Sequence, residues 1–136
     1  MCLDKVDEVT KEYTEGYKIF NKINRKTVSP ELFNIHKRFN LHQWIEDPNY
    51  GERIYYDEYT NFYKSGFHFF VNLKDAYAWM GDSNHELNID YGVFKIKVRN
   101  IVASGKQRLY GVYGDFNPRD VEVGVAKEMY IEKELT

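Results

Sequence analysis

The chain has 136 residues and a formal net charge of −2. Hydrophobic residues make up 43% of it and aromatic residues 17%, which excludes intrinsic disorder and suits one domain with its own core. The weak overall charge also excludes strong nucleic-acid binding that depends on the global electrostatic field.

The N-terminal segment, residues 1–15, combines many charges with no hydrophobic periodicity. We therefore expect a loose arm, followed by a single domain over residues 16–136. The segment is acidic and polar where a secretory signal is basic and then apolar, and no apolar run approaches the roughly 18 residues of a membrane span. Cys2 is the one cysteine, so neither a disulfide nor a thiolate metal cluster is expected. These features predict a soluble, cytoplasmic protein without membrane contacts.

The first half of the domain reads mainly as strands. Residues 16–23 predict a strand, and residues 27–34 an extended segment in which Pro30 argues against a central strand. Residues 36–50 allow two interpretations, a short helix or a strand that ends in the Asp-Pro turn. Residues 52–59 predict a short strand, and the aromatic and β-branched residues 64–71 another.

A helix is predicted over residues 72–81. Asn72 can cap its N-terminus, Asp75 suits its positive end, and Gly81 can close it in the left-handed conformation. A polar loop over residues 82–92 follows this helix. The strand predicted over residues 93–103 alternates apolar positions with the basic positions Lys95, Lys97 and Arg99.

The C-terminal part contains a glycine-rich stretch and a last strand. Residues 104–120 favour a hairpin or an irregular loop, and residues 121–133 a strand in which Gly124 and Ala126 leave room for a close approach. The fold class we predict is α+β: a single domain with a curled, mostly antiparallel sheet and one or two short helices.

His68 lies inside the aromatic strand over residues 64–71 and allows two interpretations. It can be a partly buried packing residue that hydrogen-bonds a neighbouring backbone group. Alternatively it is a titratable donor in an aromatic cleft, on the same face of the strand as Phe70.

Two groups of basic residues are candidates for binding an anion. Alternate residues on the strand over 93–103 lie about 6.6 Å apart, which suits successive phosphates or carboxylates, although an ordinary solvated face has the same pattern. In the glycine-rich stretch, cations stand beside tyrosines, a combination that suits a nucleotide as well as a mobile loop. The predicted ligand-binding residues are His68, Phe70, Lys95, Lys97, Arg99, Lys106, Arg108 and Tyr110.

No strong motif for a metal, a cofactor or a nucleophile is present. His36 and His42 are six residues apart, which does not place two ligands side by side on a helix. The glycines form no dinucleotide fingerprint and the serines no nucleophile elbow. We therefore expect no metal, no cofactor and no catalytic residue, and a binding protein more than an enzyme.

Several short stretches occur in a recognisable order: "GYKIF", "SGFHFF" followed by "NLKDA", a strand ending in "VASG", and "VGVAKEMYI". This order resembles a family of small proteins encoded by bacteriophages and prophages, and the similarity spans residues 16–131. The layout of an aromatic strand and the "DAYAWM" helix is also similar to ADP-ribosyltransferase-like domains, which grip a nicotinamide dinucleotide. However, the first strand has neither the histidine nor the arginine of those domains, His68 stands where they usually have tyrosine, and no catalytic glutamate can be assigned.

The resemblance implies a phage accessory protein that counters host defence. We expect it to bind and sequester a small nucleotide-derived immune signal. Two alternatives stay open: a protein inhibitor of a host defence complex such as a CRISPR nuclease, and a nucleotide-cleaving or ADP-ribosyltransferase-like enzyme. Exposed strand edges and abundant aromatic residues also suit association into a homo-oligomer.

Overall fold

The computed structural model describes residues 3–29, 38–57, 61–79, 90–109 and 119–135. One short helix covers residues 73–79. The strands in chain order are β1 (Lys5–Val6), β2 (Glu15–Lys22), β3 (Thr27–Ser29), β4 (Phe39–Asn40), β5 (Trp44–Glu46), β6 (Arg53–Asp57), β7 (Asn61–Lys64), β8 (Phe67–Phe70), β9 (Tyr91–Leu109) and β10 (Arg119–Leu135).

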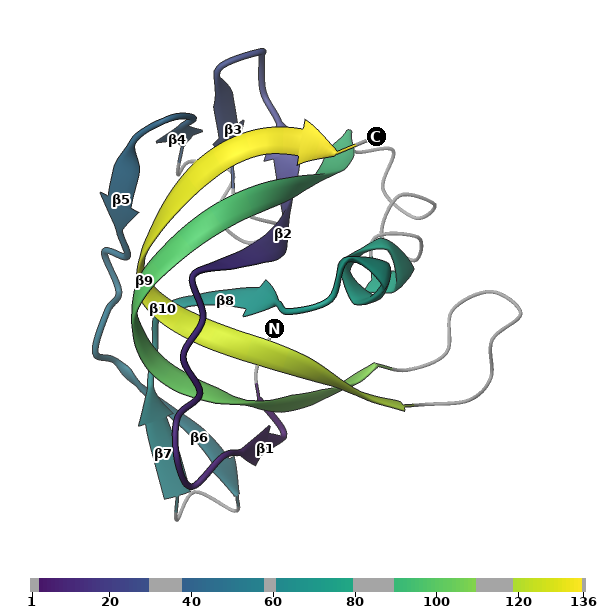
Figure 1. Cartoon of the computed structure of the whole chain (residues 1–136). Coiled ribbons are helices and arrows are strands. Elements are labelled where there is room, and N and C mark those ends of the chain that lie inside the picture. The colour runs from purple at the N-terminus through teal and green to yellow at the C-terminus, as the bar shows by residue number, and fades with distance from the viewer. Residues whose placement is uncertain (1–2, 30–37, 58–60, 80–89, 110–118, 136) are drawn as a thin grey trace.

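The sheet is antiparallel and curls until it closes on itself (Figure 1). The long strands β9 and β10 pair with each other, β10 pairs with β8, and β2 pairs with β9. The ring closes where β8 meets β2, with Tyr17 opposite Phe70. The short strands β1, β3, β4 and β5 extend this sheet, while β6 and β7 form a separate hairpin. The mostly antiparallel, curled sheet and the short helix over residues 73–79 agree with the predicted fold class.

The strand β9 follows the predicted alternation. Its apolar residues at 94, 96 and 98 are buried, whereas Lys97 and Arg99 are exposed. Both β9 and β10 bend strongly through the height of the molecule (Figure 1). The register between them shifts at Val125 and Ala126. Asn100 of β9 adopts the left-handed conformation, with φ of 58°. Asparagine tolerates this conformation better than most residues, so it suits the bend.

The strand β8 is buried on both faces because a hydrophobic core lies on each side of it. Phe70 belongs to the helix-side core, which includes Ala76 and Val123. Phe67 and Phe69 belong to the opposite core, whose other members are Phe20, Val28, Phe94, Ile96, Val98, Ala126, Met129 and Ile131. His68, which lies on this strand, is therefore buried and does not face solvent.

The Phe69 ring fills the space that the sequence left at Gly124. It lies between Gly16 and Gly124, and a Cβ atom at either glycine would fall well inside van der Waals contact with the ring. The side chain is completely buried and meets Tyr13 edge-on, with ring centroids 5.7 Å apart. The two glycines are thus required by the close approach of β2 and β10 to this ring.

The N-terminal segment is not the loose arm that we expected, at least over residues 3–15. Lys5 and Val6 pair with β9, opposite Lys106 and Gly105. Leu3 is 2% exposed and packs in the helix-side core. Burial of this side chain and the backbone pairing hold the segment in place, which the absence of periodicity in the sequence did not indicate.

Two other expectations need correction in detail. Within residues 38–50, the interpretation as strand and turn holds and the helical one does not, since β4 and β5 lie there. The strand predicted over residues 64–71 is divided between β7 and β8, because Ser65 and Gly66 belong to neither strand. Residues 82–89 of the predicted polar loop and residues 110–118 of the glycine-rich stretch lie outside the described residues. Residues 104–109, which we expected in a hairpin or loop, instead continue the strand β9.

The helix is anchored to β10 by a charged pair. Asp75 lies in its first turn, is 3% exposed, and accepts a hydrogen bond from Arg119 Nη2 at 3.1 Å.

Arg119→Ala is expected to lower the free energy of unfolding by about 1–2 kcal/mol, because it leaves a buried carboxylate without its cation. Denaturant unfolding measures this loss. Arg108→Ala, whose exposed pair with Asp120 spans 3.9 Å, is the control and should change stability by less than about 0.5 kcal/mol; equal losses would contradict the anchoring role.

Candidate functional site

A cleft of about 500 Å³ lies where the turn between β2 and β3, the segment between β4 and β5, and the end of β10 meet. These elements gather in the upper part of Figure 1. The cleft has an apolar wall that includes Leu41 and Phe94. Its charged lining residues are Lys22, Arg25, Asp90, Glu132, Lys133 and Glu134. The volume falls in the usual range for small-molecule sites.

Lys22 organises the acidic side of the cleft. Its Nζ lies 2.9 Å from Glu134 Oε2 and 3.3 Å from Asp90 Oδ1. The hydrogen bond to Glu134 is the main reason that the pKa of Lys22 is raised above 10.5. This lysine therefore carries its positive charge, and the carboxylates of Asp90 and Glu134 already balance that charge.

Arg25 and Lys133 are different from Lys22. Among the described residues, neither cation lies within ion-pair distance of a carboxylate. They come from opposite walls, since Arg25 is in the turn after β2 and Lys133 is near the end of β10. The cleft thus presents two cations that an anionic ligand could pair with.

His42 holds the segment between β4 and β5, which forms the third side of the cleft, in place. Its backbone is left-handed, with φ of 64°, and its N–H donates to the Ile131 carbonyl at 3.0 Å. Its Nε2 lies 2.9 Å from the Glu132 carbonyl, which can only accept, so Nε2 carries the proton. The neighbouring Leu41 N–H donates to the Lys26 carbonyl at 2.9 Å. These bonds tie the segment between β4 and β5 to both other walls, so the cleft is formed before any ligand arrives.

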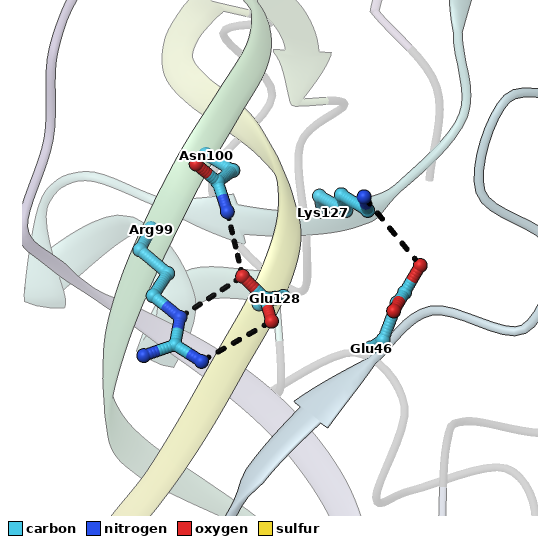
Figure 2. A network of polar contacts seen from close by, with 5 residues as sticks. All are labelled: Glu46, Arg99, Asn100, Lys127 and Glu128. Carbon is cyan, nitrogen blue, oxygen red and sulfur yellow. Dashed lines mark hydrogen bonds and ion pairs between the residues drawn. The ribbon is translucent and has the colours of Figure 1, made fainter.

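The predicted basic residues of β9 lie outside this cleft, on the outer face of the sheet. Lys95 pairs with Glu15 at 3.3 Å. Arg99 makes two hydrogen bonds with Glu128, of 2.9 and 3.2 Å (Figure 2). Lys97 lies over the ring of Tyr130, 5.3 Å from its centroid.

The second predicted basic group lies on the other half of β9. Lys106 is exposed there, and Arg108 approaches Asp120 at 3.9 Å. Tyr110 lies outside the described residues. The structure therefore does not bring this group together with Lys95, Lys97 and Arg99, and neither group reaches the cleft.

His68 and Phe70 lie in the interior, 7% and 1% exposed. The Gly66 carbonyl can only accept, so His68 Nδ1 donates to it, over 3.2 Å. His68 Nε2 then accepts from the Tyr63 hydroxyl at 2.9 Å, and that hydroxyl oxygen accepts the Leu3 N–H at 2.9 Å. Burial, with the ammonium of Lys18 as a second cause, lowers the pKa of His68 from 6.5 to about 3. His68 is thus a neutral side chain with both ring nitrogens bonded.

Sequence reasoning missed the residues that line the cleft. The basic turn over residues 24–26 was the available signal, but it has the composition of any exposed turn. His42 fell in the segment with two interpretations, and Lys133 belonged to no recognised pattern. The assignment of the eight predicted ligand residues stays a prediction.

Comparison with protein-family models, with curated proteins and with solved structures gives no match. Among the described residues, no helix is long and apolar enough to cross a membrane, and no three histidine, cysteine or acidic side chains gather in a way that could hold a metal ion.

Proposed function

We propose that this protein is a binding module that holds a small anionic ligand of nucleotide type in the cleft. The observation that carries the proposal is the pair Arg25 and Lys133, two cations on opposite walls with no acidic partner among the described residues. Phosphate oxygens would pair with them, while the apolar wall at Leu41 and Phe94 would contact the base.

The setting that we propose comes from the resemblance to phage-encoded proteins. In a host cell, the ligand would be a nucleotide-derived signal of the defence response, and the protein would sequester it in the cytoplasm. Binding needs only charge-assisted hydrogen bonds and apolar contact. We favour binding over turnover because Asp90 and Glu134 pair with Lys22, and His42 Nε2 is bonded to a backbone carbonyl. Glu132, whose Oε2 is buried without a hydrogen-bond partner, is then a single acid–base group in the described lining, whereas turnover generally needs two.

The test is a calorimetric and thermal-shift panel of cyclic dinucleotides, cyclic ADP-ribose isomers, ADP-ribose and NAD, with the ligand recovered and checked by chromatography. At 100 times its Kd, a bound ligand adds about 2.7 kcal/mol of stability. We expect one member to bind and to be recovered unchanged. No binding by any member would contradict the proposal, and a changed ligand would favour the enzyme alternative.

For the ligand that binds, Arg25→Ala combined with Lys133→Ala is expected to weaken affinity by at least about 100-fold, since each lost charge-assisted bond costs roughly 1.5–3 kcal/mol. Isothermal titration measures the loss. Lys97→Ala is the matched control, because it removes an exposed cation from the outer face, and it should bind as the wild type does. Loss of binding in the control with retention in the double variant would place the ligand on the outer face instead.

A further inference from the structure

The outer face of β9, β10 and β5 carries two neighbouring rows of side chains that cross the three strands. In one row, Lys97 of β9 lies opposite Tyr130 of β10, which lies opposite Trp44 of β5. In the next row, Arg99 lies opposite Glu128, which lies opposite Glu46. We call these six residues the cross-strand face.

The aromatic part of this face is exposed although it is held in place. Trp44 is 39% exposed, and its ring lies 5.8 Å from that of Tyr130. The Arg99 guanidinium lies over the Trp44 ring, 3.9 Å from its centroid. Exposed tryptophan, tyrosine and arginine in a fixed arrangement are the residues that dominate the energy of protein interfaces.

Arg99 is fixed by a network around Glu128 (Figure 2). Glu128 accepts two bonds from Arg99, which are the main cause that lowers its pKa below 4.5. It also accepts a bond of 2.6 Å from Asn100 Nδ2, and Asn100 is held in the left-handed conformation. Because Arg99 is already held in place, binding of a partner would cost little additional side-chain entropy at this residue.

The charges on the face are paired, with one exception. Arg99 is neutralised by Glu128, and Lys127 lies 3.7 Å from Glu46 (Figure 2). Lys97 has no carboxylate within ion-pair distance among the described residues, because Glu15, directly opposite it on β2, pairs with Lys95. The face thus ends in one uncompensated cation beside its aromatic rings.

The spacing of the first row matches that of an α-helix. Adjacent strands are about 4.8 Å apart, so Trp44 and Lys97 are separated by roughly 10 Å across two strand spacings. Helix residues i and i+7 lie on one face, about 10.5 Å apart at 1.5 Å per residue, and residue i+3 or i+4 lies between them. A helix laid across the strands therefore places three consecutive contacts on Trp44, Tyr130 and Lys97.

We propose that the cross-strand face docks an amphipathic helix of a partner protein, with an apolar residue on Trp44, a second on Tyr130, and a carboxylate seven residues after the first on Lys97. A single-stranded nucleic acid fits less well, because Glu128 and Glu46 stand within the face and would repel phosphates, and Arg99 already covers one side of the Trp44 ring. This surface adjoins the cleft, because the His42 ring lies 6.4 Å from that of Tyr130, but none of its six residues lines the cleft.

The experiment is a selection from a displayed helical scaffold in which positions i, i+3, i+4 and i+7 are randomised, carried out on the wild-type protein with depletion against Trp44→Ala. We expect apolar residues at i and at i+3 or i+4, and Asp or Glu at i+7. The selected helices should bind Trp44→Ala at least about tenfold more weakly. Tyr55→Ala, which removes an exposed aromatic from β6, is the control and should bind as the wild type does.

A charge exchange keeps the test independent of folding. Selection on Lys97→Glu, a change at an exposed position, should yield Lys or Arg at i+7 in place of the acid. The proposal is overturned if no selected helix depends on Trp44, or if the preference at i+7 is not reversed by Lys97→Glu. It is also overturned if a single-stranded oligonucleotide binds the wild type more tightly than the selected helices and loses that binding in Trp44→Ala.

Discussion

Phe69→Ala is expected to lower the free energy of unfolding by about 3–5 kcal/mol, the largest effect of any single change considered for this chain. The ring is completely buried between two glycines. The cavity left by its removal cannot close, because β2 and β10 would have to move out of their pairings with β9 and β8 to fill it. Denaturant unfolding followed by circular dichroism measures the loss. Phe62→Ala, the same change on a ring that is 44% exposed, should cost less than about 1 kcal/mol.

A double-mutant cycle with Gly124 tests the cause of this loss. Alone, Gly124→Ala should cost about 1–3 kcal/mol, because the new methyl group collides with the Phe69 ring. In the Phe69→Ala background the methyl group enters vacated space, so its cost should fall below about 1 kcal/mol. Additive losses would show that the glycine is required for a reason other than this ring.

Stability is expected to fall by about 2 kcal/mol between pH 7 and pH 5 because of His68. Its pKa is about 3 in the folded protein and near 6.5 when unfolded, so below pH 6.5 the unfolded chain takes up a proton that the folded protein does not. Protonation therefore favours unfolding, progressively from pH 6.5 down to about pH 3. Urea titrations at both pH values measure the difference. Glu128 acts in a separate window, since the stability from its lowered pKa is lost only below about pH 4.5.

The His68→Gln variant provides the comparison. It should lose most of the pH dependence between pH 7 and pH 5, whereas His42→Gln, a change on the surface, should retain it. If His68→Gln proves too unstable to titrate, the ring signals of His68 in the wild-type protein can be followed by NMR and should not shift above about pH 4. Titration of these signals near pH 6 would contradict the buried, neutral histidine.

The parts of the fold that could be predicted are those where local pattern and final environment agree. The alternation over residues 93–103 predicted β9 because one face of that strand is buried and the other is not. The small residues Gly124 and Ala126 predicted a close approach. That Phe69 makes this approach depends on the pairing of β8 with β10, which no local pattern encodes.

The cleft could not be predicted for the same reason. Arg25 and Lys133 lie far apart in the sequence, and they share a cleft because β2 and the end of β10 flank β9 on opposite edges. His42 joins them because its backbone bonds to β10. The interior position of His68 was one of the two interpretations of the sequence, and the choice between them needed the second core on the other face of β8.

The closed ring of strands has a consequence for how the chain folds as it is made. Residues 15–21 of β2 pair with residues 91–97 of β9, so at ribosomal rates of about 5–20 residues per second the nascent β2 waits roughly 4–15 s for its partner. During that time Ile19 and Phe20, both buried in the finished protein, are available to other chains. Translation speed and chaperone access are therefore expected to influence the yield of this protein more than that of a helical protein of the same length, in which contacts form between near neighbours.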